Sequence, residues 1–244
     1  MRNKGMKIGA VIVLLLCGFC WWYAADYYHA DDVTEYMRSS ENVSVRQDGN
    51  AVAFVPDEAV QGFIFYPGGK VEHTAYAPLM SKLADHGVLC VLVEMPLNLA
   101  VLDIDAADGI RERYPQIKSW YIGGHSLGGS MAASHAVNNA SDYDGLVLLA
   151  SYSAADLSNT DLEVLSIYGS KDGVLSAEKY AENKVNLPAS FEEHVIKGGC
   201  HAGFGSYGAQ AGDGVPEISG EEQMEETVRL LMDFFMCARS LAEC

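Results

Sequence analysis

Apolar-rich extended segments alternate with amphipathic segments along most of the chain. The pattern predicts strands at 51–55, 62–66, 88–93, 119–122, 145–150, 164–168 and 190–196. It predicts helices at 74–86, 103–113, 128–137, 177–184 and 221–239. This alternation is typical of a mostly parallel sheet with helices on both faces. No Pro/Ser-rich linker or repeat interrupts it, so we expect one α/β domain over 51–244, with 26–50 as a stalk and the edge of that domain.

The first 25 residues have a different character. Residues 8–25 carry no charge and, as a helix, would span roughly 27 Å, about one hydrocarbon core. Arg2, Lys4 and Lys7 precede this segment, and Trp21, Trp22 and Tyr23 stand near its far end. Flanking positive charge and interfacial aromatic rings are typical of a membrane span with a cytoplasmic N-terminus. The segment therefore predicts a single-pass signal anchor and an extracytoplasmic domain at the cell membrane.

Two alternatives to the anchor stay open. Cleavage after Ala25 would secrete the domain, although Tyr23 then stands at −3, where signal peptidase prefers small residues. Lipid attachment at Cys17 or Cys20 would follow a bulky Leu16 or Phe19. The anchor fits the segment best, and it would make the membrane a partner of this chain.

Charge and composition narrow the classes of function. The formal net charge is −17, and removing the three basic residues of the first 25 leaves −20 on residues 26–244. An acidic domain argues against nucleic-acid binding. Six cysteines are too few for a disulfide scaffold, and Cys90, inside a continuous apolar run, is expected to be a buried free thiol. Pairing among Cys90, Cys200, Cys237 and Cys244, and the oligomeric state, are left open.

The clearest chemical motif is GGHSLGGS at 123–130. Within it, Gly124, His125, Ser126, Leu127 and Gly128 form a G-x-S-x-G sequence between a predicted strand and a predicted helix. This is the context of a nucleophile elbow, a tight turn that projects a serine hydroxyl above the sheet. An ordinary Gly-rich turn is the alternative. The flanking elements favour Ser126 as a nucleophile, with Gly124 and Gly128 avoiding steric collisions.

A serine nucleophile needs a base that is oriented by an acid. In this architecture the acid and then the histidine follow the serine in sequence. His201 lies in a Gly-rich loop after the last predicted strand, whereas His194 lies inside that strand. Asp172 directly follows strand 164–168, a position that Asp144, Asp156 and Asp161 lack. The sequence therefore predicts a Ser126–Asp172–His201 triad.

The oxyanion of the reaction should be held by two backbone amides. The N–H of Leu127, directly after the nucleophile, is the first. The second should come from the loop YPGGKV at 66–71, where Gly69 and Lys70 are equal candidates. No metal motif is present, and a G-x-G-x-x-G match at 203–208 stands too late in the chain for a dinucleotide site, so we expect neither a metal nor a cofactor.

The elbow GHSLGG, the acid turn GSKDG and the loop GGCHAGFGSYG, in that order, resemble the α/β-hydrolase superfamily. Together with YPGGKV they look like a bacterial group of small, membrane-anchored or exported α/β-hydrolases, over roughly residues 50–240. The resemblance implies an α/β-hydrolase fold, the Ser126–Asp172–His201 triad and carboxylic-ester hydrolysis. Pro67, where many esterases carry histidine, and Cys200, where asparagine is frequent, depart from the pattern without removing a catalytic group.

The resemblance also places lid domains of this fold between strands 145–150 and 164–168. Only thirteen residues intervene here, too few for a helical cap, so we expect an open site. An open site suits small acyl groups, or esters carried on a polymer. The predicted function is a serine hydrolase that cleaves such esters through an acyl-enzyme. Acyl transfer, thioester or peptide cleavage by the same triad, and a non-catalytic surface binding protein on this fold, are the alternatives.

Overall fold

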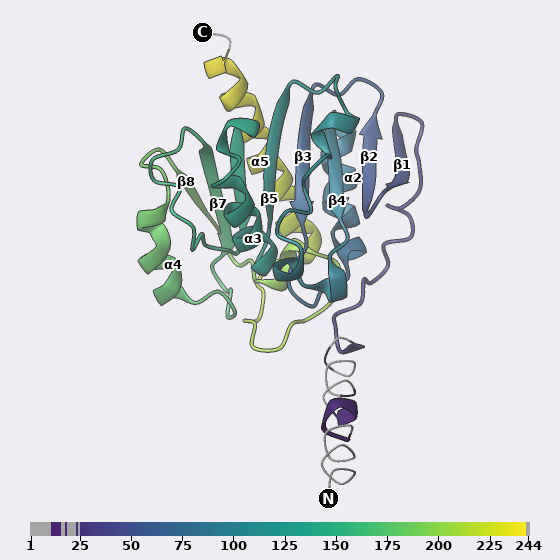
Figure 1. The fold of residues 1–244 in the computed structure, drawn as a ribbon, viewed down its shortest axis with the longest axis vertical. Helices are drawn as coiled ribbons and strands as arrows, with labels where there is room; N and C mark the ends of the chain where they lie inside the picture. The colour runs from purple at the N-terminus through teal and green to yellow at the C-terminus, as the bar shows by residue number, and fades with distance from the viewer. Residues whose placement is uncertain (1–10, 16–17, 19–22, 24, 243–244) are drawn as a thin grey trace, which may run out of the picture.

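The computed structural model describes residues 11–15, 18, 23 and 25–242, with side chains up to residue 236. These residues contain one eight-stranded sheet (Figure 1). Its strands are β1 (Val43–Asp48), β2 (Ala51–Pro56), β3 (Gln61–Tyr66), β4 (Val88–Val93), β5 (Ser119–His125), β6 (Gly145–Leu149), β7 (Glu163–Gly169) and β8 (Glu192–Ile196). Their order is β1-β2-β4-β3-β5-β6-β7-β8; β1 and β2 are antiparallel to their neighbours and the rest are parallel.

Helices cover both faces of this sheet. The regular helices are α2 (Ala77–Asp85), α3 (Leu127–Ala136), α4 (Ala177–Asn183) and α5 (Gly220–Ala242). Figure 1 shows α2 and α5 behind the sheet and α3 in front of it. The three-layer α/β architecture expected from the sequence is thus confirmed, with a mostly parallel sheet.

The alternation of side chains along each strand divides the core into two clusters. In β4, Cys90 and Leu92 point into the cluster shared with α2 and α5, whereas Leu89 and Val91 point into the cluster shared with α3. A strand buried on both faces must be apolar at every position, which is why the continuous run at 88–93 was recognisable as a strand. Cys90 is a free, fully buried thiol, as predicted.

Two expectations from the sequence differ from the structure. Strand β1 was not anticipated within 26–50, because among its residues only Val43 is buried. The helix expected at 103–113 is wrong. This segment forms turns, followed by a single 3-10 turn at Arg111–Arg113. Asp103, Asp105 and Asp108 favour turns, and Gly109 has a φ of +71°, a left-handed conformation that ends any helix.

The predicted anchor falls largely outside the described residues. Within the parts of the chain that the structure describes, no helix is long and apolar enough to cross a membrane. The anchor at 8–25 therefore stays a prediction from the sequence.

Helix α5 provides a test of the packing. Leu231 is fully buried against the sheet, whereas Met236, five residues further along the same helix, is 57% exposed. We expect Leu231→Ala to lower the free energy of unfolding by about 2–5 kcal/mol, because it removes buried methyl groups and leaves a cavity. Met236→Ala should change it by less than about 0.5 kcal/mol. Urea unfolding followed by circular dichroism measures both; equal effects would contradict this packing.

Candidate active site

Ser126 occupies the sharp turn between β5 and α3. Its φ of 52° and ψ of −121° are rare for a residue with a side chain and cost about 1–3 kcal/mol. The Ser126 N–H donates to the Leu149 carbonyl on the neighbouring strand at 2.9 Å, which fixes the turn on the sheet. The strained serine at a strand-to-helix junction has the geometry that the G-x-S-x-G motif predicted.

The two glycines of the motif are required by contact with the neighbouring loop. A Cβ on Gly124 would lie 2.5 Å from the Tyr66 carbonyl oxygen, and a Cβ on Gly128 would overlap the carbonyl oxygens of both Tyr66 and Pro67. Any side chain here would separate the nucleophile turn from the loop that follows β3. These glycines therefore bring Ser126 close to the predicted oxyanion loop.

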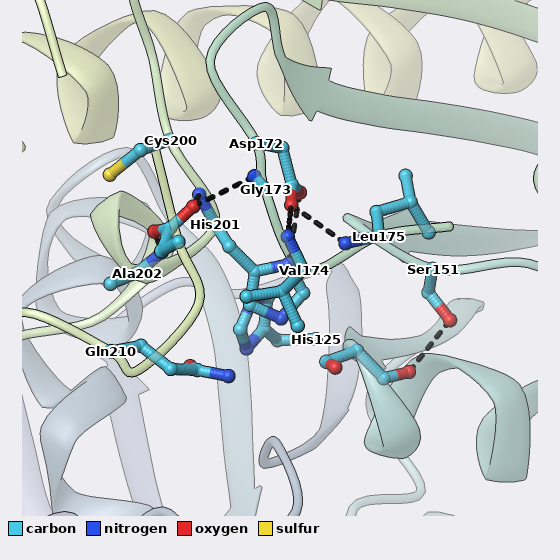
Figure 2. A network of polar contacts seen from close by, with 12 residues as sticks. His125, Ser151, Asp172, Gly173, Val174, Leu175, Cys200, His201, Ala202 and Gln210 are labelled. Atoms are coloured by element: carbon cyan, nitrogen blue, oxygen red, sulfur yellow. Dashed lines mark hydrogen bonds and ion pairs between the residues drawn. The ribbon is translucent and has the colours of Figure 1, made fainter. Parts of the chain in front are cut away.

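His201 and Asp172 form a buried pair above the carboxyl ends of β8 and β7. The His201 Nδ1 atom lies 2.9 Å from Asp172 Oδ2, and the two side chains are 1% and 3% exposed. The other carboxylate oxygen accepts the N–H groups of Val174 and Leu175, each at 2.8 Å (Figure 2). These bonds fix the orientation of the carboxylate, and the carboxylate in turn orients the imidazole.

The other ring nitrogen of His201 is available for proton transfer. Among the described residues, His201 Nε2 is buried and has no hydrogen-bond partner, and no hydrogen bond joins it to Ser126. Both residues line the same pocket. Catalytic hydrogen bonds are often long in an empty site and shorten when substrate binds, so this arrangement is compatible with a serine–histidine pair.

Asp213 holds two loops of the candidate site together, and the sequence did not reveal it. Its carboxylate accepts four backbone N–H groups, from Gly173 and His201 at 3.0 and 3.1 Å and from Ala202 and Gly214 at 2.9 and 2.8 Å. Burial raises the pKa of Asp213, but these four hydrogen bonds together lower it below its usual value. One carboxylate thus joins the acid turn to the histidine loop. No motif marks it, because its partners are backbone N–H groups, which almost any residue can supply.

His125 belongs to a buried network behind the nucleophile. Its Nδ1 lies 2.8 Å from the Tyr76 hydroxyl, which also accepts the Gly68 N–H at 3.1 Å. If the Tyr76 hydroxyl donates its proton to Nδ1, the neutral His125 ring carries its own proton on Nε2, which is buried and has no hydrogen-bond partner among the described residues. Burial, and next the nearby His201, hold the pKa of His125 well below its ordinary value. A neutral ring therefore lies beside His201, with ring centroids 4.5 Å apart.

The hydrogen bonds of the loop after β3 distinguish between its amides. Gly68 N–H donates to Tyr76, and Lys70 N–H donates to the Asn98 carbonyl at 2.7 Å. The hydrogen bonds of the described residues include none from Gly69 N–H or Leu127 N–H. A Cβ on Gly69 would lie 2.9 Å from Leu127 Cδ2, so these two residues are neighbours. Gly69, rather than Lys70, keeps a free N–H next to the nucleophile turn.

The pocket in front of Ser126 is small and open. Its volume is about 290 Å³, and its lining comprises Ser126, Leu127, Ser130, Ala150, Ser151, Tyr152, Val174, Leu175, Ser176, Lys179 and His201. The Ser151 hydroxyl donates to the Ser126 carbonyl at 2.7 Å, which supports the turn from the pocket side. Residues 150–162, all of them described, form turns and loop without a helix, in agreement with the expected lack of a cap.

The remaining candidates lie away from this pocket. His194 is half exposed on β8 beside Glu192, and His135 is buried between Asp105 and Tyr143. Cys200 is a buried free thiol. Within the described ranges, no group of three or more His, Cys, Asp or Glu residues is arranged to hold a metal ion.

Comparison with known proteins agrees with the fold. Residues 62–225 match the model of the alpha/beta hydrolase family, and the chain belongs to that family. None of the curated proteins matches this chain in sequence. The motif-based resemblance to α/β-hydrolases is thereby confirmed at the level of the family.

Three solved structures illustrate the shared fold. A predicted CIB-like hydrolase from Thermoplasma acidophilum is 16% identical, with a TM-score of 0.59 over 79% of this chain and 100% of the other. Est1E from Butyrivibrio proteoclasticus is 13% identical, with a TM-score of 0.58 over 82% and 100%. A dienelactone hydrolase from Anabaena variabilis is 15% identical, with a TM-score of 0.58 over 81% and 97%.

Replacing Asp213 tests its part in holding the two loops. Asparagine has one acceptor oxygen, so Asp213→Asn must lose the bonds made by either Oδ1 or Oδ2. We expect the free energy of unfolding to fall by about 1.5–3 kcal/mol at neutral pH, because hydrogen bonds to a charged acceptor are lost. Urea denaturation checks this, with the exposed Asp161→Asn as the matched control.

The difference should depend on pH. Because folding lowers the pKa of the Asp213 carboxyl, its stabilising contribution is present above the unfolded value of about 3.9 and is lost as the pH falls through the folded value. The wild type and Asp213→Asn should therefore converge in stability below about pH 4. A difference that stays constant from pH 7 to pH 3.5 would contradict this role.

Proposed function

We propose that this chain is a serine hydrolase that cleaves carboxylic esters with small acyl groups through an acyl-enzyme intermediate. The observation that carries the proposal is the common pocket of Ser126 and His201, with His201 held by Asp172 and its Nε2 left without a partner among the described residues. Membership of the alpha/beta hydrolase family supports hydrolase chemistry.

In the acylation half, Ser126 Oγ attacks the ester carbonyl as its proton moves to His201 Nε2. A C–Oγ bond forms, and the carbonyl oxygen becomes an oxyanion that the N–H groups of Gly69 and Leu127 stabilise. The tetrahedral intermediate collapses as the bond to the alcohol breaks, and His201 returns the proton to the departing oxygen. Water then repeats these steps on the acyl-enzyme and releases the acid.

The surroundings of His201 favour this proton transfer. The buried Asp172 carboxylate stabilises the imidazolium that forms in each half-reaction. The neighbouring His125 is kept neutral by burial, so it places no second positive charge beside that imidazolium. The two adjacent histidines therefore have different tasks: His201 accepts and returns the proton of the reaction, whereas His125 supports the turn.

The pocket favours small acyl groups. Its volume of about 290 Å³ lies at the lower end of ligand pockets, and its apolar wall is limited to a few side chains that include Val174 and Leu175. The absence of a helix over residues 150–162 leaves the entrance open, which also allows an ester carried on a polymer.

Removal of the nucleophile tests the proposed chemistry. Ser126→Ala should abolish labelling by a fluorophosphonate probe and lower kcat for p-nitrophenyl acetate by at least about 10⁴-fold, because no acyl-enzyme can form. Ser134→Ala, a serine on α3 that does not line the pocket, is the matched control and should keep both. Correctly folded wild-type protein that is neither labelled nor active would refute the proposal, and would favour a binding role.

The acyl chain length tests the substrate class. We expect kcat/KM to be highest for p-nitrophenyl acetate or butyrate and to fall about tenfold or more for the octanoate, because the longer chain extends beyond the small apolar wall. Leu175→Ala removes part of this wall and should reduce the difference in kcat/KM between the short and the long ester. A preference for octanoate would contradict the proposed pocket. Assays with acetylated polysaccharide, a thioester, a peptide and an added alcohol acceptor separate hydrolysis of polymer-borne esters from the alternative reactions.

A further inference from the structure

The segment 26–32, which precedes β1, lies against the loop that carries Gly69. Tyr28 forms a parallel β-bridge with Val71. Its N–H donates to the Lys70 carbonyl at 2.7 Å, and its carbonyl accepts the Glu72 N–H at 2.9 Å. The Glu72 carboxylate accepts the Ala30 N–H at 3.1 Å. The segment therefore pairs with the oxyanion loop through a single β-bridge, along the lower edge of the domain in Figure 1.

The same segment also contacts the loop that follows His201. The Tyr28 hydroxyl accepts the Ala211 N–H at 3.0 Å, and its ring lies 5.7 Å from that of Tyr207. Asp31 N–H donates to the Ser206 carbonyl at 2.8 Å, and the Ser206 hydroxyl donates to the Asp31 carbonyl at 2.7 Å. The segment thus bridges two loops that are more than 130 residues apart in sequence.

The sheet alone does not hold these loops together. The oxyanion loop follows β3 and the histidine loop follows β8, and strands β5, β6 and β7 lie between them. Their alignment depends on contacts above the sheet edge, such as the bond from Ser206 N–H to the Ala75 carbonyl at 2.7 Å. Tyr28 is placed to fix that alignment because its backbone contacts one loop and its side chain contacts the other.

The contact with Lys70 bears directly on Gly69. Lys70 has a φ of +59°, an unfavourable conformation for a residue with a side chain. Both of its backbone polar groups are bonded, the N–H to Asn98 and the carbonyl to Tyr28. These two bonds hold the turn in the orientation that leaves the Gly69 N–H free. If the Tyr28 side chain lost its contacts with the histidine loop, the backbone of Tyr28 would be held less firmly against Lys70, and the turn that carries the Gly69 N–H would move more freely.

We propose that Tyr28, Ala30 and Asp31 of segment 26–32 clamp the two catalytic loops together and that Tyr28 is a positioning residue for the reaction. This inference rests on the proposed function, since it assigns the clamp to the oxyanion amide and the catalytic base. The clamp acts on groups that work in the transition state, so its loss should lower kcat and leave KM nearly unchanged.

Two substitutions in the full chain test the clamp. Tyr28→Ala removes the ring and the hydroxyl, whereas Tyr28→Phe removes only the bond to Ala211. We expect kcat for p-nitrophenyl acetate to fall about tenfold in Tyr28→Ala and about threefold in Tyr28→Phe, less than the loss of a whole oxyanion donor, with KM within about twofold. Tyr27→Ala is the matched control, because the aromatic contact of Tyr27 is with the exposed His29, and it should retain wild-type kcat.

Hydrogen exchange gives a readout that does not depend on activity. In both Tyr28 variants, amide exchange should rise in residues 68–72 and 202–211, whereas strand β5 should keep its protection. A folded Tyr28→Ala chain with unchanged kcat, or unchanged exchange in both loops, would overturn the clamp. If Tyr28→Ala does not fold, Tyr28→Phe gives the same decision. If the wild type cleaves no ester, the proposed function fails while the exchange measurement still tests the clamp.

Discussion

The site depends first on the close contact between the nucleophile turn and the carbonyls of Tyr66 and Pro67. Because Gly128 has no side chain, the start of α3 approaches the end of β3 more closely than any other residue would allow. This contact gives Ser126 its strained conformation and brings Leu127 beside Gly69. The nucleophile and the proposed oxyanion amides are therefore positioned by one packing constraint.

Two carboxylates, the buried Asp172 and the half-buried Asp213, form the second layer of organisation. Residues 26–244 carry a net charge of −20, so most acidic side chains have no basic partner. Asp172 and Asp213 instead accept hydrogen bonds from backbone N–H groups. Such bonds compensate for the loss of water around each charge and hold the pKa of Asp213 below its usual value. The acid turn and the histidine loop consequently share one electrostatic framework, in which Asp172 orients the imidazole and Asp213 orients its backbone.

The sequence predicted the features that depend on residues close together along the chain. Ser126 was recognisable because the glycines it requires are its neighbours, and β4 because a strand buried on both faces is a continuous apolar run. Asp213 was missed because its partners are backbone amides, which leave no residue signature. The choice between Gly69 and Lys70 could not be made from sequence, since it depends on the distant Asn98 and Tyr76. The helix expected at 103–113 was wrong because the prediction followed the apolar spacing of this segment. In the structure the aspartates of the segment favour turns instead.

The same distinction explains why the position of residues 26–32 could not be read from the sequence. A polar, irregular segment before a domain resembles a linker, because such a segment has no apolar face of its own to bury. Its backbone, however, can supply hydrogen bonds wherever another loop leaves donors and acceptors unpaired. The loops after β3 and β8 leave such groups unpaired, since each loop runs beyond the end of the sheet, where no neighbouring strand can pair with it. A fold that spreads its catalytic loops over five adjacent strands, from β3 through β5, β6 and β7 to β8, needs such an external element more than a fold whose loops meet at neighbouring strands.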